Sequence, residues 1–439
     1  MKNPSLLTIA GSDSGGGAGV QADIKTFAAC GVHAVCAITA VTSQNTHGVQ
    51  HVFPLPAEVV VEQLESVFSD FDVEFAKIGM LYSSETIRVV GKYLKKHDVS
   101  YVVDPVMSAE AGGNLLPTDA LLSLKDLIKD AFAVTPNKFE AQTLTGVTIT
   151  SIDDAKRAAL KLCEIGTKAV VVTGGHLDCR DVVLSEGRFK VINGSVEGGT
   201  HGAGCTYSAA LTANLMFGDD IFDAAKKAKN FVIDAISSSR QVGGGVSPVN
   251  QMHRIIEDAD RFNVLQNLAH AVKELQECSE CVLLLPEVGC NIAMAIQEAS
   301  TPSDVAAVEG RIVRLYDRMH LTGCIGFGAS RHVARIIISA LRFNPVLRSA
   351  MNIRFTPEIL DACNKLKLNT VSFSREDEPS LTKTMDWGTS YAFLHAAETP
   401  DVIYDEGGVG KEAMIRLLGT DALSVAKKAT LIARIASDT

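Results

Sequence analysis

The sequence contains no apolar run of the ~20 residues that a membrane-spanning helix needs, and its first residues carry neither the hydrophobic stretch nor the cleavage site of a secretory signal. It also contains no run of Lys or Arg, and its net charge is -10. Tight binding to a nucleic-acid backbone depends on clustered cations. We therefore expect a cytoplasmic protein whose partners are small molecules, with no membrane and no nucleic acid among them.

A paired cysteine framework is also missing. The ten cysteines are scattered, which fits a reducing compartment better than a disulfide scaffold. Cys278 and Cys281 form a CxxC motif, but neither a second CxxC nor a His pair follows at zinc-finger spacing. We interpret them as core cysteines.

The composition is that of a folded protein, with 46% apolar and 21% charged residues. A chain of 439 residues exceeds what one hydrophobic core usually supports. Two domains are therefore predicted.

In the first half, short β-branched runs alternate with amphipathic stretches, a pattern typical of βαβ units. Buried strands are predicted at 6–10, 34–41, 75–79, 101–106, 131–135 and 169–173, and helices at 57–71, 84–97, 152–165, 203–217 and 219–239. Residues 181–192, with Glu186-Gly187 at the turn, predict a hairpin at a sheet edge. The fold class is α/β, with a mostly parallel sheet between helices.

Three glycines and a proline at 242–248 interrupt this pattern, and a polar stretch follows. We place a first domain at 1–249, a linker at 250–262 and a second, smaller α/β domain at 263–439. In the second domain, strands are predicted at 281–285, 352–355, 370–374 and 401–404, and helices at 264–277, 331–341, 357–366 and 422–436.

Two glycine-rich segments do not match known nucleotide-binding motifs. Residues 11–19 follow a strand but do not have the G-x-G-x-x-G spacing of a dinucleotide fold. Residues 407–412 lack the spacing and the Ser/Thr of a Walker A loop. For 407–412 we predict a solvated turn.

The segment 198–206 differs because it runs directly into a predicted helix. Small residues at Gly202, Ala203 and Gly204 would let backbone N–H groups approach a phosphate, and the helix dipole adds to their field. Such a cradle suits phosphoryl transfer, in which negative charge spreads over the transferring oxygens. A tight turn that only caps the helix explains the segment equally well.

Cys205 lies in the first turn of that helix, where the dipole is expected to lower a thiol pKa. It could therefore act as a base. Taken alone, a buried helix cysteine is the simpler interpretation.

Five segments together resemble hydroxymethylpyrimidine (phosphate) kinase, a ribokinase-like enzyme; they are residues 10–26, 39–46, 104–107, 135–140 and 199–206. The match covers about 250 residues in the same order. The resemblance implies a three-layer α/β/α fold and transfer of phosphate from ATP to the pyrimidine alcohol and then to its monophosphate. It also leads us to expect self-association.

The same resemblance implies the site residues. Gln44 would pair with the aminopyrimidine edge through its amide, which offers both a donor and an acceptor, and Gly11, Asp23 and Met80 would line that pocket. Gly202, Ala203 and Gly204 would form the anion hole, with Cys205 where sugar kinases of this fold carry an aspartate base.

For the metal, the resemblance implies that Asp104, Asn137 and Glu140 hold Mg²⁺ against the nucleotide phosphates, directly or through water. Taken alone, Asp104 and Asn137 would more simply be turn caps and Glu140 a surface helix residue. One departure concerns the nucleotide: Thr173 stands beside the double glycine, where many members have lysine.

The second domain resembles the thiamine-phosphate synthase domain found fused to this kinase, on residues 286–292, 304–312, 326–332, 351–354 and 400–405. The implied reaction joins the pyrimidine diphosphate to a thiazole phosphate and releases pyrophosphate. Arginine forks suit a departing diphosphate. We therefore choose Arg311 first, and His332 as a donor near the predicted cap Ser330. Arg331 and Arg354 rank second; a solvated charge and a surface histidine are the plainer interpretations.

Two alternatives remain open. The second domain could be a ligand-sensing module, although no helix-turn-helix or basic stripe is evident. The first domain could phosphorylate another hydroxymethyl heterocycle such as pyridoxal, against which Gln44 and Cys205 argue.

Overall fold

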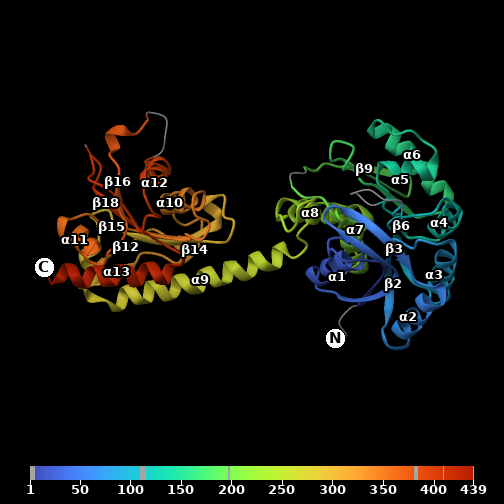
Figure 1. Ribbon diagram of the computed structural model, residues 1–439, viewed down its shortest axis with the longest axis horizontal. Coiled ribbons are helices and arrows are strands. Elements are labelled where there is room, and N and C mark those ends of the chain that lie inside the picture. Colours follow the sequence, from blue (N-terminus) through green and yellow to red (C-terminus); the bar gives the residue numbers. More distant parts are fainter. Residues whose placement is uncertain (1–4, 109–114, 196–197, 380–383, 409, 439) are drawn as a thin grey trace. The chain divides into compact units, whose positions relative to one another are not determined.

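The chain consists of two compact units, Met1–Ile255 and Ile256–Thr439. The structure, a computed structural model, describes residues 5–108, 115–195, 198–379, 384–408 and 410–438 (Figure 1). Within these ranges, no helix is long and apolar enough to cross a membrane.

A nine-stranded sheet forms the centre of the first unit, in the order β3-β2-β1-β4-β5-β6-β7-β8-β9. Its strands are β1 (Ser5–Asp13), β2 (His33–Asn45), β3 (Gly48–Pro54), β4 (Val73–Ile78), β5 (Ser100–Val103), β6 (Ala133–Val134), β7 (Ala169–Val172), β8 (Asp181–Ser185) and β9 (Arg188–Ile192). The six strands from β2 to β7 along this order pair in parallel, and the two edges are antiparallel. The parallel strands align their carboxyl ends at one edge of the sheet, where ligands of open α/β sheets bind.

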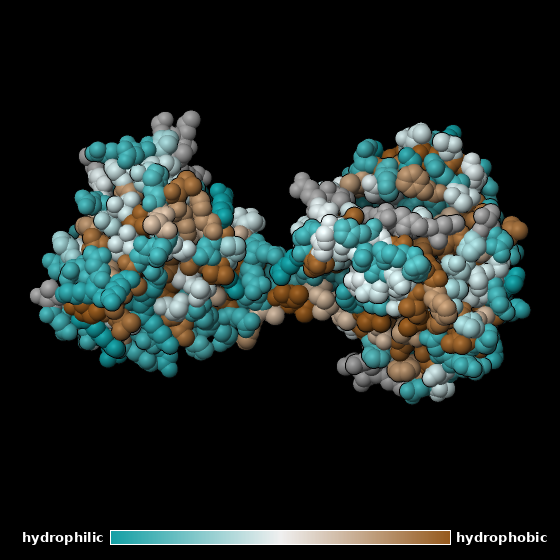
Figure 2. Space-filling model, viewed as in Figure 1, coloured by the Kyte–Doolittle hydropathy of each residue, from teal (hydrophilic) through white to brown (hydrophobic). Residues whose placement is uncertain are grey.

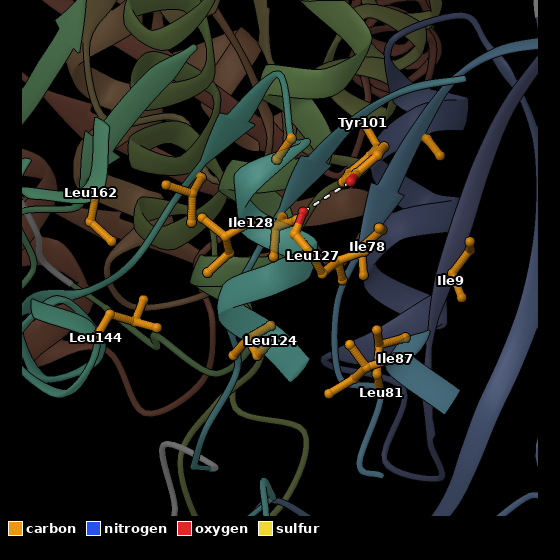
Figure 3. Packing of buried hydrophobic residues seen from close by; sticks show 14 of the residues in the cluster. Ile9, Ile78, Leu81, Ile87, Tyr101, Leu124, Leu127, Ile128, Leu144 and Leu162 are labelled. Carbon is orange, nitrogen blue, oxygen red and sulfur yellow. Dashed lines mark hydrogen bonds between the residues drawn. The ribbon is translucent and has the colours of Figure 1, made fainter. Parts of the chain in front are cut away.

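Helices cover both faces of this sheet, giving three layers. They are α1 (Gly19–Ala29), α2 (Ala57–Asp70), α3 (Ser84–Lys96), α4 (Leu121–Lys129), α5 (Lys138–Thr145), α6 (Ile152–Ile165), α7 (Ala203–Met216) and α8 (Ile221–Ser237). The side chains of α2 to α6 pack in one apolar cluster, and α1, α7 and α8 pack on the opposite face. Figure 3 shows the first cluster, in which Tyr101 donates a hydrogen bond of 2.9 Å to the carbonyl of Leu127.

The α/β class, the parallel sheet and the hairpin over 181–192 are confirmed. In the first unit, α5 and α6 each begin at a complete capping box. The sequence analysis missed β3 and the short helices α1, α4 and α5, because glycine-rich or brief segments carry weak periodicity.

The second unit is built on a seven-stranded, mainly antiparallel sheet in the order β14-β11-β10-β15-β18-β17-β16. Its strands are β10 (Asn291–Ala295), β11 (Val305–Val308), β14 (Ile325–Phe327), β15 (Ser349–Arg354), β16 (Thr370–Ser372), β17 (Val402–Asp405) and β18 (Met414–Gly419), and β12 (Ile312–Leu315) and β13 (Arg318–Leu321) form a separate hairpin.

The α-helices described in this part of the chain are α9 (His253–Glu277), α10 (Arg331–Leu341), α11 (Pro357–Lys365), α12 (Thr384–His395) and α13 (Ala422–Ser437). Apolar residues of α9, α11 and α13 pack on one face of the sheet, and those of α10 and α12 pack on the other. On the visible surface of each unit, hydrophobic residues emerge as separate patches among hydrophilic ones (Figure 2).

Three predictions for the second half need correction. Residues 281–285 are not a strand; Ser279–Leu284 form a 3-10 helix whose apolar residues Cys281 and Leu284 are buried, and a short apolar run does not distinguish the two. The helix predicted at 264–277 begins at His253, inside the segment 250–262 that we assigned to a linker. Several strands, among them β10, β11 and β18, were not predicted.

Two plainer interpretations are confirmed. Cys278 and Cys281 are buried and free. In the 407–412 loop, Gly408 and Lys411 exchange both backbone hydrogen bonds, at 3.0 and 2.9 Å, as a tight turn does; Val409 lies outside the described residues.

Candidate active sites

The first site begins where β1 ends at the glycine-rich loop. Oδ1 of Asp13 accepts the N–H of Gly15 at 2.7 Å, and Oδ2 accepts those of Gly17 and Ala18 at 2.9 and 2.8 Å. Burial opposes the charge of Asp13, but these bonds and one to His201 hold its pKa below the usual value. The loop is therefore organised around a carboxylate.

The second loop, ahead of α7, packs against the first through backbone. Gly202 is the N-cap of α7, with φ +84°, and a side chain there would lie 1.8 Å from the carbonyl oxygen of Gly17. A side chain at Gly17 would in turn lie 2.3 Å from the His201 ring. At position 202, only glycine fits both the positive φ and the close approach to the Gly17 carbonyl.

The predicted anion hole therefore sits at the start of α7, as its sequence suggested. Gly202, Ala203 and Gly204 lie at the junction of loop and helix, and no side chain hydrogen bonds cap the helix there. The N-terminus of a 14-residue helix is open to an anion's charge.

Cys205 lies in that first turn, but its pKa is not lowered as we expected. Burial, together with the charges of Asp104 and Asp23, outweighs Lys77 and raises the pKa of the thiol to about 12. The helix dipole does not overcome this desolvation. Cys205 is therefore a thiol at neutral pH, and its side chain helps to lower the pKa of the neighbouring Asp104.

Sequence reasoning missed Lys77, the only lysine on β4, whose side chain is fully buried. Its Nζ lies 3.0 Å from Asp23 and 3.8 Å from Asp104. Burial disfavours the ammonium, yet Asp23, Cys205 and Asp104 raise its pKa above the ordinary value. A lysine inside a buried strand needs charged partners, and that signal could have found it.

Asp23, predicted to line the substrate pocket, is engaged within this cluster. It is fully buried and accepts bonds from Thr8 at 2.6 Å and Lys77 at 3.0 Å. It therefore supports the lysine.

Gln44 lies on β2 at an irregularity in the strand. The β2–β3 register shifts between Ser43 and Gln44, and such a bulge re-aims a side chain. Ser14 of the first loop fixes the Gln44 backbone, because its Oγ donates to the Gln44 carbonyl at 2.7 Å and accepts the Gln44 N–H at 2.8 Å.

Gly11 and Met80, also predicted for the substrate pocket, lie together. A side chain at Gly11 would come within 2.3 Å of the Met80 methyl group. Met80 is buried, and its carbonyl accepts the Thr39 hydroxyl at 2.6 Å. The glycine leaves room for the methionine.

The predicted metal residues form two groups. Asn137 caps α5 by accepting the N–H groups of Phe139 and Glu140, and Glu140 accepts the N–H of Asn137 at 2.8 Å. Asp104, at the end of β5, accepts the Ser208 hydroxyl at 3.0 Å.

The two carboxylates fit a cation better than the amide does. Burial and the nearby charge of Asp104 raise the pKa of Glu140 to about 8, so two buried acids lie within electrostatic range and lack a full counter-charge. A divalent cation would supply it. Among the described residues, no group of three His, Cys, Asp or Glu side chains is arranged to hold a metal by itself, so such an ion would need ligands from substrate or water.

Beside the double glycine, Thr173 donates its N–H to the Pro136 carbonyl at 2.9 Å. The neighbouring Gly174 N–H donates to Asp181 at 2.7 Å, and Lys229 of α8 meets the same carboxylate at 2.8 Å. A buried lysine from a different segment thus supports this turn.

The candidate site of the second unit is a cluster of arginines. Asp405, at the end of β17, pairs with Arg416 at 2.6 Å and with Arg375 at 2.5 Å, and all three are largely buried. Arg416 also lies over the Phe373 ring at 5.1 Å. One carboxylate faces two guanidinium groups, so the cluster keeps an excess of positive charge.

The predicted residues Arg311 and His332 belong to this positive region. Both side chains are exposed, yet partial desolvation of the His332 ring, followed by the charges of Arg416, Arg311, Arg375 and Arg335, lowers the pKa of His332 to about 4. The imidazole is therefore neutral at pH 7 and can still donate one N–H. Arg311 packs against Gly289, whose Cβ would lie 3.2 Å from the arginine Cδ.

Ser330 is the N-cap of α10, as predicted, but its side chain makes no cap hydrogen bond. Sequence reasoning did not single out Arg375, Arg416 or Asp405. An arginine inside β18, flanked by Ile415 and Leu417, was the available signal.

Both halves of the chain match known families. Residues 13–250 match the family model described as phosphomethylpyrimidine kinase, and residues 267–430 match that of thiamine-phosphate synthase ThiN. Over 433 residues the chain is 35% identical to a bifunctional thiamine biosynthesis protein ThiDN of Methanocaldococcus jannaschii, covering 98% of each.

The first half has further relatives. It is 44% identical over 252 residues to a hydroxymethylpyrimidine/phosphomethylpyrimidine kinase of Bacillus subtilis, covering 56% of this chain and 93% of the relative. A solved pyridoxal kinase of Staphylococcus aureus, in complex with AMP-PCP and pyridoxal, is similar with a TM-score of 0.53 and 33% identity, over 58% of this chain and 95% of that one.

Proposed function

The chain belongs to the bifunctional thiamine-biosynthesis family that joins a phosphomethylpyrimidine kinase domain to a ThiN-type thiamine-phosphate synthase domain, and from this premise we propose the reactions and residues of each domain. The first domain phosphorylates 4-amino-5-hydroxymethyl-2-methylpyrimidine, and then its monophosphate, with ATP. The second couples the resulting diphosphate to a thiazole phosphate. We assign these activities to residues 1–249 and 263–439, joined by 250–262.

The observation that carries the kinase proposal is the contact between the two loops. The Gln44 side of the site and the start of α7 meet through Gly17 and Gly202, so a pyrimidine at Gln44 would present its hydroxymethyl group to phosphates held at 202–205. Positioning and fixed donors supply most of the rate enhancement in phosphoryl transfer. The AMP-PCP complex of the similar pyridoxal kinase supports ATP as the donor.

Cys205 takes the proton of the substrate hydroxyl in this proposal. Because the resting thiol has a pKa of about 12, it can accept that proton only as it passes its own to Asp104, whose pKa the neighbouring thiol lowers. A loose transition state needs the proton removed late, so a relay of this kind suffices. The proton ends on Asp104, which becomes neutral, and Asp23 at 3.0 Å remains the counter-ion of Lys77.

Mg²⁺ would be held by Asp104, Glu140 and Asn137, directly or through water. When bound it would neutralise charge on the nucleotide phosphates. The excess of buried carboxylate at Asp104 and Glu140 supports this assignment.

In the second domain, Arg311 binds the departing diphosphate, and neutral His332 donates a hydrogen bond to one of its oxygens. Charge-assisted bonds strengthen as negative charge develops on a leaving group. The surplus of arginine around Asp405 supports an anionic ligand there.

A coupled assay tests both proposals. The full chain is incubated with the pyrimidine alcohol, thiazole phosphate, ATP and Mg²⁺, and we expect thiamine phosphate. Accumulation of the pyrimidine diphosphate alone would leave the second domain as a ligand-sensing module.

A second kinase substrate follows from one observation. The similarity to a pyridoxal-bound kinase favours some turnover of pyridoxal. We expect the aminopyrimidine to be preferred in a direct competition assay, and the reverse preference would overturn the assignment.

A further inference from the structure

His201, in the loop before α7, lies between Asp13 and Gln44, the residue proposed to bind the substrate. Its Nε2 lies 3.1 Å from Oδ2 of Asp13 and 3.4 Å from the terminal amide of Gln44. The ring is buried, and its backbone is held by Ser247 and Val249 through hydrogen bonds of 3.3 and 3.1 Å. The imidazole therefore has one fixed position between two partners.

Asp13 determines which atom of His201 carries a proton. Each carboxylate oxygen already accepts backbone N–H groups, and an ionised carboxylate can only accept. Nε2 of His201 must therefore donate, so the proton lies on Nε2.

A donor at Nε2 restricts the amide of Gln44. If the amide NH₂ faced His201, two donors would meet. The amide oxygen would then compete with the Ser12 carbonyl for the single hydroxyl proton of Thr42, because the Thr42 Oγ1 lies 3.2 Å from the amide oxygen and 3.0 Å from that carbonyl. With the amide reversed, its oxygen shares the Nε2 proton of His201 with the nearer Asp13, its NH₂ donates to Thr42, and Thr42 donates to Ser12. Every proton then has an acceptor, and amide orientation is assigned on such networks.

We propose that His201, held by Asp13 with its proton on Nε2, fixes the orientation of the Gln44 amide and thereby acts as a specificity-determining positioning residue of the kinase site. The proposal rests on the proposed pyrimidine kinase function and deepens it. The Gln44 amide then keeps one lone pair on its oxygen, on the side of His201, and one N–H, on the side of Thr42, for the substrate.

That order matches one kind of substrate edge. An aminopyrimidine offers an amino donor next to a ring-nitrogen acceptor, and the fixed amide can pair with both. The 4-oxo analogue of the same pyrimidine exchanges donor and acceptor, so it meets the amide the wrong way round. A site built to hydrogen-bond one pattern rejects the other strongly.

The protonation state can be measured without turnover. In the full chain with ¹⁵N-labelled histidine, we expect the His201 signal, assigned by its loss in His201→Gln, to show a protonated Nε2 at neutral pH. An unprotonated Nε2 would overturn the proposal. Because this measurement needs no activity, it stands apart from failure of the proposed kinase function, which would appear as no phosphorylation by the unaltered chain.

Kinetics test the consequence for specificity. His201→Leu keeps the volume but not the donor, and Thr42→Val removes the other fixed partner; in each we expect the kcat/KM ratio of the amino substrate over its oxo analogue to fall on the order of tenfold. His201→Gln can still donate and should restore the ratio. An equal loss for both substrates in His201→Leu and Thr42→Val, with the ratio unchanged, would reduce His201 to loop support and overturn the proposal.

Discussion

The two sites handle negative charge in opposite ways. In the first unit, the proposed phosphate site consists of backbone from the glycine-rich loops, and Lys77 is buried among Asp23, Asp104 and Cys205. In the second, arginine side chains outnumber the carboxylate that holds them. The charged groups of the kinase site are therefore part of its buried core. In the second site, replacement of one exposed arginine can lower the positive charge without disturbing the sheet.

Replacement of Lys77 should give the largest effect. Lys77→Met leaves Asp23 and Asp104 buried without their cation, and breaking a buried pair in this way costs about 3–5 kcal/mol. We expect a lower unfolding midpoint of the first unit and loss of kinase activity, measured by denaturant unfolding and by pyrimidine phosphorylation.

Lys95→Met is the matched control, because its pair with Asp130 is exposed and should contribute little. If both variants unfolded at the same denaturant concentration as the unaltered chain, the kinase site would not depend on its buried charges.

Arg311→Ala should separate the two sites. Removing a donor to developing charge costs about 10²–10³ in rate, so thiamine phosphate formation should fall by that factor while pyrimidine phosphorylation is retained. Arg318→Ala, on the exposed side of β13, is the control. Parallel loss of both activities in Arg311→Ala would indicate a folding defect instead.

Cys205→Ala should lower kcat of the kinase by about 10², with little change in the KM for the pyrimidine, because the thiol serves the proton and not the ring. Steady-state kinetics measure both, and Cys163→Ala, on α6, is the control. Unchanged turnover would remove Cys205 from the mechanism.

The smallest effect is a titration. His332 should titrate near pH 4, not 6.5, so it favours the neutral form in the folded state. Its contribution to stability is full above pH 6.5 and is lost as the pH falls toward 4. Arg311→Ala should move the titration upward, as NMR of the histidine ring would show; an unshifted value near 6.5 would mean that the arginines do not surround it.

Sequence pattern and spacing predicted the parallel sheet, its hairpin and the junction of loop and helix at 198–206. These features depend on the periodicity of apolar residues and on the positions of glycine, which are local properties of the sequence. The pKa of Cys205 could not be predicted, since it is raised by burial and by the charges of Asp104 and Asp23, residues distant in sequence. Nor could the capping box show whether Asn137 and Glu140 serve the helix or a metal.

The second unit was less predictable for a related reason. Its antiparallel strands are short and several follow each other closely. The alternation of apolar and polar residues is therefore too brief in each strand to be recognised. Arg416 and Arg375 converge only because β18 and the segment after β16 meet at Asp405.

Helix α9 has a practical consequence for anyone who wishes to divide this protein. It runs without a break across Ile255 and Ile256: Arg254 near its start binds Asp234 of α8, while Val264 and Leu268 are buried with the second unit. A cut at the unit boundary would sever a continuous helix. Expression of the halves apart should therefore end the first at 250 and begin the second at 251, leaving the helix whole.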